Sequence, residues 1–331
     1  MSVPTLLEAR NLVQEFRFAG GIVRALSNVS LTVRTGEVLG VVGESGSGKS
    51  TLARSLLQIP PPKSGTVLFR DADLTQLRGR RLLEQRRHMQ MIFQDPFGSL
   101  NPAWRVVDIV GEPLRGYNVG TRALRQRKVA EVLELVGLPL ERYGRRRPRE
   151  LSGGQCQRIA IGRALTLDPA LIVCDEAVSS LDVLIQAQIM NLFDRLRTEL
   201  GLSYVFISHD LALVKQSSDR VAVLHLGQLC EIAPAESLYR HPRHPYTASL
   251  LRSIPGVRPR ERRIGRADRV TFSEPPSAID PQTGCRFRTS CPHAKEKCAS
   301  EEPRLQRAGD DHFVACHFPL AAGDHATAPA A

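Results

Sequence analysis

Short apolar runs alternate with longer amphipathic segments along most of the chain. The runs that predict buried strands lie at residues 38–42, 89–93, 171–174, 203–207 and 221–224. The segments that predict helices lie at residues 52–57, 77–88, 129–136, 152–165 and 185–200. Strands rich in Val, Ile and Leu that alternate with helices predict an α/β fold with a parallel, doubly wound sheet.

Three regions depart from this alternation. Residues 5–42 alternate short apolar segments with turn residues, which predicts an antiparallel β layer leading into the first buried strand. Residues from about 95 to 165 have a helical pattern and predict a helical subdomain. After residue 240, Pro, Arg and small residues dominate and the periodicity is weak. We therefore predict one domain at 1–240 and a small, irregular C-terminal domain at 241–331.

The composition is that of a soluble globular protein, with 42% hydrophobic and 24% charged residues. No apolar run approaches the length of a membrane-spanning helix, and the N-terminus lacks the pattern of a secretory signal. We therefore expect the chain in the cytosol, with its cysteines reduced or bound to metal.

The chain carries a net charge of +11, and nearly all of its positive charge is arginine, clustered at residues 78–87 and 142–149. A net positive charge of this size suits a negatively charged partner such as nucleic acid or an anionic membrane. Aromatic residues make up only 5% of the chain, however, so a base-stacking platform is not expected. A solvated surface, or a face toward lipid headgroups, is the favoured interpretation.

A glycine-rich loop follows the first buried run and precedes a helix. It matches G-x-x-x-x-G-K-[ST] in the strand–loop–helix context that such a match requires. Glycines let backbone N–H groups approach phosphate oxygens, and the helix N-terminus attracts negative charge. We expect Lys49 to reach the β- and γ-phosphates and the Ser50 hydroxyl to ligate Mg²⁺. The predicted nucleotide-binding residues of this loop are Gly43, Glu44, Ser45, Gly46, Ser47, Gly48, Lys49, Ser50 and Thr51.

Two acids follow the apolar run at residues 171–174. In a phosphate-loop enzyme the first, Asp175, orients Mg²⁺, and the second, Glu176, polarises the attacking water as a general base. The pair alone is a weak signal, because apolar strands that end in acids are common. It gains weight from Leu-Ser-Gly-Gly-Gln at residues 151–155 and Ser-His-Asp at residues 208–210.

With these segments combined, residues 5–240 resemble the ATP-binding subunits of ABC transporters, whose core is a phosphate-loop NTPase fold. The resemblance implies that two such subunits pair head to tail, with ATP between one phosphate loop and the partner's signature loop. It assigns the signature to Ser152, Gly153, Gly154 and Gln155, the D-loop to Asp182, the Q-loop and a Mg²⁺ contact to Gln94, and the switch histidine to His209. In this scheme His209 holds Glu176 and the attacking water in place.

An aromatic side chain is expected to stack on the adenine. Phe16 is the favoured candidate, ahead of Phe18. Alternatively, both phenylalanines pack within the β layer, since aromatic residues most often serve cores.

Three segments narrow the resemblance to the oligopeptide/dipeptide importers, a group that also serves nickel and other small solutes. They lie at residues 91–102, at 176–183 with 186–188, and at 241–247, the last reading His-Pro-Arg-His-Pro-Tyr-Thr. The resemblance implies a second ATPase subunit, two transmembrane permease subunits and, indirectly, a solute-binding protein outside the membrane. It places the chain on the cytoplasmic face of the inner membrane, coupled to the permeases around Gln94 and residues 95–150. No specific nucleic acid partner is expected.

Four cysteines in the C-terminal region have the spacing C-x₅-C-x₆-C-x₁₇-C. They are Cys285, Cys291, Cys298 and Cys316. Four soft thiolates in a cytosolic chain suit an iron–sulfur cluster or zinc, although the C-x₂-C pairs of common zinc ribbons are missing. The similar tail of the importer subfamily implies a [4Fe–4S] cluster in some members. Iron–sulfur is favoured over zinc, thiols without metal are a third alternative, and the expected role is structural.

The favoured function is an ATPase that energises import of oligopeptides or dipeptides, with the solute inferred from resemblance alone. One alternative is an ABC-type ATPase that acts on nucleic acid through the arginine clusters and a zinc-like cysteine site. The single nucleotide-binding domain and the few aromatic residues stand against it. Another alternative is a regulatory subunit that binds ATP without turnover, in which Glu176→Gln would change nothing.

Overall fold

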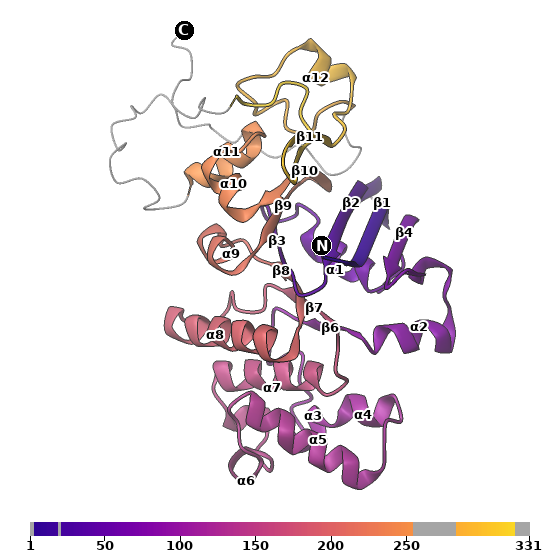
Figure 1. Ribbon diagram of the computed structural model, residues 1–331, viewed down its shortest axis with the longest axis vertical. Helices are drawn as coiled ribbons and strands as arrows, with labels where there is room; N and C mark the ends of the chain where they lie inside the picture. Colours follow the sequence, from indigo (N-terminus) through magenta and orange to yellow (C-terminus); the bar gives the residue numbers. More distant parts are fainter. Residues whose placement is uncertain (1–2, 19–20, 254–282, 322–331) are drawn as a thin grey trace.

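The computed structural model describes residues 3–18, 21–253 and 283–321. In these ranges two sheets pack side by side, with helices around them (Figure 1). The strand order is β2-β1-β4-β5 in the smaller sheet and β11-β12-β10-β9-β3-β8-β7-β6 in the larger. The predicted α/β class is confirmed.

The smaller sheet is antiparallel. Its strands are β1 Thr5–Phe18, β2 Gly21–Arg34, β4 Ser64–Phe69 and β5 Ala72–Asp73. Leu7 of β1 lies opposite Val33 of β2 and Phe69 of β4, and all three side chains are buried. One face of this sheet thus contributes a row of apolar side chains to the core, and the predicted antiparallel β layer is confirmed.

The larger sheet is mostly parallel. Its strands are β3 Val38–Val42, β6 Met89–Ile92, β7 Leu171–Asp175, β8 Ser203–Ile207, β9 Arg220–His225, β10 Gln228–Pro234, β11 Gln306–Gly309 and β12 His312–Val314. Strands β6, β7, β8, β3 and β9 run parallel, so their carboxyl ends share one edge. That edge is where ligands bind in open α/β sheets.

The central strands are buried on both faces. In β7, Leu171 and Val173 belong to the core cluster shared with the smaller sheet, whereas Ile172 and Cys174 belong to the cluster shared with the long helices. This alternation between two cores explains why the strand reads as a continuous apolar run.

Twelve α-helices and two short 3₁₀ turns surround the sheets in the described part of the chain. The α-helices are α1 Lys49–Leu56, α2 Gly79–Arg86, α3 Val106–Val110, α4 Glu112–Gly116, α5 Arg122–Leu135, α6 Leu140–Tyr143, α7 Gly153–Leu165, α8 Val183–Leu200, α9 Leu211–Ser217, α10 Ala235–Arg240, α11 Pro245–Arg252 and α12 Glu296–Ser300. The 3₁₀ turns span Leu74–Gln76 and Pro148–Glu150. Helices α3 to α7 gather at one end of the molecule, below the larger sheet in Figure 1.

Helix α5 begins earlier than its apolar pattern predicts, at Arg122 rather than at residue 129. Its first turn is capped by Thr121, whose hydroxyl accepts a hydrogen bond from the N–H of Leu124. Residues 122–124 are exposed, so they carry no apolar periodicity. The cap is the signal that places this helix start.

The described part of the C-terminal segment is joined to the larger sheet. Strand β12 pairs with β10, with Val314 opposite Glu231 and Phe313 opposite Ile232. Asp311, in the turn between β11 and β12, forms an ion pair of 2.7 Å with Arg34 of β2. The irregular sequence after residue 240 concealed this hairpin, because short strands leave little periodic signal. The division at residue 240 stays a prediction.

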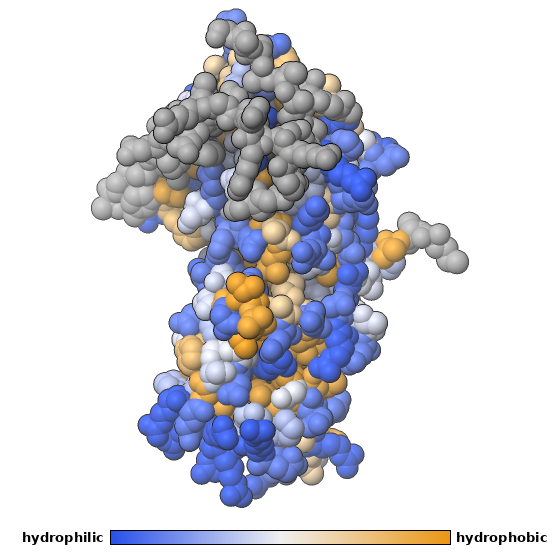
Figure 2. All heavy atoms as spheres, turned by 90° about the vertical axis from the view of Figure 1, so that its left-hand side faces the viewer, coloured by the Kyte–Doolittle hydropathy of each residue, from blue (hydrophilic) through white to orange (hydrophobic). Residues whose placement is uncertain are grey.

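The surface is largely polar. In Figure 2 hydrophilic residues dominate the lower end of the molecule, which is the helical region of Figure 1, and apolar groups are exposed nearer the middle. Arg142, Arg145, Arg147 and Arg149 of this region are exposed. No helix within the described ranges combines the length and the apolar character needed to cross a bilayer.

Candidate functional site

The phosphate loop (residues 43–51) connects β3 to α1 at the carboxyl edge of the larger sheet. Gly43 and Gly48 have φ angles of 152° and 101°. A Cβ atom at Gly43 would lie 2.2 Å from the carbonyl oxygen of Leu224. One at Gly48 would lie 2.4 Å from the carbonyl oxygen of Ala25. Close contact and backbone conformation therefore both require glycine here.

The side chain of Lys49 folds back over this loop. Its Nζ donates hydrogen bonds of 2.8 Å to the carbonyl oxygens of Gly43 and Glu44. Burial lowers the pKa of Lys49, and the nearby carboxylates of Glu176 and Asp175 oppose that shift. The loop thus surrounds a fixed cation at a helix N-terminus, an arrangement that attracts phosphate.

Asp175 ends β7 and contacts Ser50 in the first turn of α1. The Ser50 hydroxyl donates a hydrogen bond of 2.9 Å to Oδ1 of Asp175. Burial raises the pKa of Asp175, while the hydrogen bond from Ser50 acts in the opposite direction. A hydroxyl and a carboxylate beside a phosphate loop are oxygen ligands of the kind that Mg²⁺ prefers. Of the three predicted Mg²⁺ ligands, the structure joins these two by a hydrogen bond.

Glu176 lies where the loops after β6, β7 and β8 meet. Nε2 of Gln94 donates a hydrogen bond of 3.0 Å to Oε2 of Glu176, and Nδ1 of His209 lies 3.3 Å from the same oxygen. The backbone of Glu176 has a φ angle of 51°, which is uncommon outside glycine, and its N–H donates to the carbonyl of Ile207. Strained conformations of this kind cluster at functional sites. The predicted base is therefore held by two side chains that the sequence also singled out.

The predicted signature and D-loop residues cap helices. Ser152 and Gln155 form a capping box at the start of α7, each side chain accepting from the other's backbone N–H. Asp182 caps α8 by accepting from the N–H of Ile185 over 3.0 Å. A Cβ at Gly154 would lie 2.5 Å from Cγ2 of Ile185, so the first turns of α7 and α8 pack tightly. Their predicted contact with the nucleotide of a second subunit stays a prediction.

Phe16 lies on β1 opposite Val23, and its side chain is 41% exposed. That exposure argues against a core-packing role for Phe16. Stacking on adenine stays a prediction, and the side chain of Phe18 lies outside the described residues.

The four C-terminal cysteines line one small cavity together with Phe287. They are Cys285, Cys291, Cys298 and Cys316. Burial raises the pKa of Cys291 to about 11 and that of Cys316 to about 12. Among the described residues no group of three or more His, Cys, Asp or Glu side chains is arranged to hold a metal ion. The structure brings the thiols together, and the metal stays a prediction.

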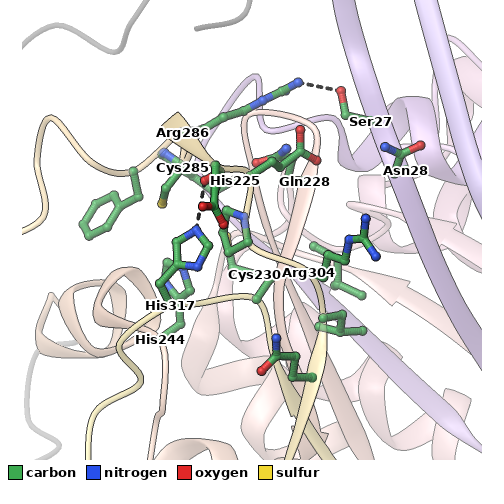
Figure 3. Close-up of a pocket in the computed structure, with 18 of the residues that line it drawn as sticks. Ser27, Asn28, His225, Gln228, Cys230, His244, Cys285, Arg286, Arg304 and His317 are labelled. Carbon is green, nitrogen blue, oxygen red and sulfur yellow. Dashed lines mark hydrogen bonds between the residues drawn. The ribbon is translucent and has the colours of Figure 1, made fainter. Parts of the chain in front are cut away.

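Two further residues support the phosphate loop, Tyr246 directly and Arg286 through a neighbouring turn, and the sequence analysis assigned no role to either. The N–H of Glu44 donates a hydrogen bond of 3.1 Å to the hydroxyl of Tyr246, which lies on α11. The guanidinium of Arg286 donates to Ser27 Oγ of β2 (Figure 3). It also donates to the carbonyl of Leu226. The signal for Tyr246 was the motif at residues 241–247, which predicts a subfamily but no contact.

Comparison with known families matches two regions of the chain. The family model described as "ABC transporter" matches residues 26–179. The one described as "Oligopeptide/dipeptide transporter, C-terminal region" matches residues 230–298. The second region includes Tyr246, Arg286 and three of the four clustered cysteines.

Curated proteins align along nearly the whole chain. The chain is 46% identical over 322 residues to a putative peptide import ATP-binding protein of Brucella ovis, covering 96% of this chain and 98% of that protein. It is 45% identical over 322 residues to the oligopeptide transport ATP-binding protein AppF of Bacillus subtilis, covering 95% and 97%. Among solved structures, the dimeric ATP-binding cassette MJ0796 bound to ADP and Pi superimposes with a TM-score of 0.63. That match has 29% identity and covers 69% of this chain and 98% of that one.

Proposed function

This chain belongs to the family of ABC transporter ATP-binding proteins, and we propose that its hydrolysis of ATP drives the import of oligopeptides or dipeptides through a membrane transporter. The observation that carries the proposal is Glu176, held by Gln94 and His209 at the same sheet edge as the phosphate loop. The peptide solute is supported by the C-terminal region match and by the names of the relatives.

Each residue of the site has a role in this scheme. Lys49 and the loop N–H groups bind the β- and γ-phosphates, and Ser50 and Asp175 hold Mg²⁺. When bound, Mg²⁺ neutralises charge on the phosphate oxygens. Glu176 accepts a proton from the attacking water, and His209 and Gln94 keep its carboxylate in position.

A second ATPase subunit and two permeases complete the proposed assembly at the cytoplasmic face of the inner membrane. Support for an interface comes from the start of α8, where Val183 and Leu184 are 78% and 77% exposed beside the D-loop. Two adjacent apolar side chains that open to solvent suit a partner surface. Gln94 and the segment after it are the proposed contact with the permeases.

We further propose that Cys285, Cys291, Cys298 and Cys316 hold a structural [4Fe–4S] cluster, with zinc as the alternative. Four thiols around one cavity are the donor set that such a group needs. Binding releases the thiol protons, because the metal ligand is the thiolate.

The transport proposal is tested with the chain reconstituted in vesicles together with its permeases and solute-binding protein. We expect peptide uptake and ATP hydrolysis that depend on each other, and loss of both in Lys49→Ala. Uptake of nickel instead of peptide would leave the ATPase assignment intact but would contradict the assignment of peptide as the transported solute. Hydrolysis that is indifferent to the permeases, but stimulated by nucleic acid, would overturn the transport function.

The cluster proposal is tested on anaerobically purified protein by assaying iron, zinc and acid-labile sulfide. We expect about four iron and four sulfide per chain, lost in Cys291→Ser. The matched control is Cys156→Ser, which changes a buried cysteine far from the cavity in sequence. One zinc per chain without sulfide would favour a zinc site. A sample with neither iron nor zinc would show that the thiols bind no metal.

A further inference from the structure

Tyr246 reaches the phosphate loop from the C-terminal segment. The hydroxyl of Tyr246 accepts the N–H of Glu44, the second residue of the loop, over 3.1 Å. The ring is fully buried, with its centroid 4.2 Å from that of His225 and 5.3 Å from that of Phe287. Its backbone N–H donates to Nδ1 of His244 over 3.0 Å. The hydroxyl is therefore held in place by the packing of the ring against His225 and Phe287.

Arg286 supports the other part of the loop through β-turn residues. Its guanidinium donates to the carbonyl of Leu226, and the N–H of the next residue, Gly227, donates a hydrogen bond of 2.8 Å to the carbonyl of Ser47. The same guanidinium donates to Ser27 Oγ, which fixes the turn against β2. Arg286 is itself only 8% exposed. A second residue of the C-terminal segment thus supports the loop indirectly, through the turn at Leu226 and Gly227.

The phosphate loop needs such support because its glycines leave the backbone free. All three, Gly43, Gly46 and Gly48, have positive φ angles. A glycine-rich segment loses more conformational entropy on becoming ordered than other sequences do. Contacts that order the loop before the nucleotide arrives remove part of that loss from the binding step.

We propose that Tyr246 is a positioning residue of the nucleotide site. Its hydroxyl fixes the beginning of the phosphate loop, and Arg286 supports the part around Ser47, so that the C-terminal segment sets the affinity for ATP. This proposal rests on the assignment of residues 43–51 as the phosphate-binding loop. It gives the C-terminal segment a role in ATP binding, in addition to any contact with transport partners.

The test compares Tyr246→Phe with wild type in the full-length chain. The variant removes one hydrogen-bond acceptor and keeps the ring. We expect the Kd and KM for ATP to rise about fivefold, equivalent to about 1 kcal/mol, with kcat at saturating ATP unchanged. The split between KM and kcat is the signature of positioning, because Glu176, Gln94 and His209 keep their contacts. Adding Arg286→Gln should multiply the rise in Kd, since the two contacts act on different parts of the loop.

The matched control is Tyr239→Phe. The Tyr239 hydroxyl also makes one hydrogen bond, to the carbonyl of Leu211, and Tyr239 lies on α10 without a hydrogen bond to the loop. We expect this control to keep the wild-type Kd. An unchanged Kd in Tyr246→Phe, or equal rises in both variants, would overturn the proposal. So would a fall in kcat together with a lower unfolding temperature.

Measuring Lys49→Ala in the same binding assay distinguishes a failure of this proposal from a failure of the assignment of residues 43–51 as the phosphate-binding loop. If Lys49→Ala binds ATP with the wild-type affinity, the phosphate-loop assignment is wrong, and the proposal for Tyr246 is wrong as well. If Lys49→Ala loses binding while Tyr246→Phe does not, only the role of Tyr246 fails.

Discussion

Two glutamate–histidine pairs in the described part of the chain differ in their exposure to solvent. In the first, Glu176 and His209 lie 3.3 Å apart, and their side chains are 17% and 60% exposed. In the second, Glu231 and His312 lie 2.6 Å apart, and the exposed fractions are 0% and 4%. The same two residue types therefore form an open pair at the sheet edge and a sealed pair between β10 and β12.

The two pairs also differ in the number of hydrogen bonds that their carboxylates accept. The carboxylate of Glu231 also accepts the backbone N–H groups of Arg243 and His244, and Nδ1 of His312 lies 3.2 Å from Ser237 Oγ. Both oxygens of that carboxylate are occupied, as burial requires. In the open pair, the side-chain partners of Glu176 among the described residues, Gln94 and His209, both contact Oε2. The open pair is suited to catalysis and the sealed pair to stability.

Glu176→Gln tests the open pair most strongly. Removing the base should lower ATP hydrolysis by about 10²–10⁴-fold, while ATP binding and the unfolding midpoint remain those of wild type. Hydrolysis is measured with the assembled transporter, binding by nucleotide titration. Glu199→Gln, an exposed change on α8, is the control. Equal hydrolysis in Glu176→Gln and wild type would support the regulatory subunit without turnover.

Glu231→Leu tests the sealed pair. It leaves two backbone N–H groups and His312 without their acceptor, so the free energy of unfolding should fall by about 3 kcal/mol. Urea denaturation measures that loss, and kcat per folded molecule should stay within about twofold of wild type. Glu236→Leu, which removes an exposed ion pair on α10, should change stability by less than about 1 kcal/mol. A catalytic defect at full folding would contradict the structural role of Glu231.

His209→Ala removes the other half of the open pair. Since the base remains but loses one positioning contact, we expect hydrolysis to fall about 10²-fold, less than for Glu176→Gln. The side chain is exposed, so the unfolding midpoint should not change. Single-turnover measurements on the assembled transporter check this order. A larger loss in His209→Ala than in Glu176→Gln would exchange the roles of the two residues.

Gln94→Ala should have the smallest effect. It removes one hydrogen bond to Glu176, so we expect hydrolysis to fall about fivefold, the kinetic equivalent of about 1 kcal/mol. The double variant with His209→Ala should show coupling, because both side chains contact the same oxygen. Strictly additive effects would show that the two side chains act independently of each other.

The sequence singled out both members of the open pair, because they follow apolar strands within recognisable motifs, and the structure places them 3.3 Å apart. Their catalytic roles stay predictions. The parallel strand order β3-β8-β7-β6 then brings together the loops that carry these residues. The alternation of strands and helices predicts a parallel sheet but does not predict the order of its strands. The apolar pattern places the start of α5 too late, because the first turn of this helix contains no buried residues. The hairpin β11–β12 was not predicted, since seven strand residues in two short pieces leave no clear period.

The phosphate loop is the part that the sequence determines by itself. Its glycines, its lysine and the helix that follows are neighbours along the chain, and Lys49 bonds to carbonyls only five and six residues away. These contacts are local, so the motif can be read from the sequence, although the loop also packs against distant residues such as Leu224 and Ala25. The surroundings of Glu231 and Tyr246 depend on the tertiary structure. Glu231 meets its partners 12, 13 and 81 residues away, and Tyr246 meets Glu44 across 202 residues. Only strand pairing and packing create such contacts, because a buried polar group takes whichever partner the fold brings within hydrogen-bonding distance.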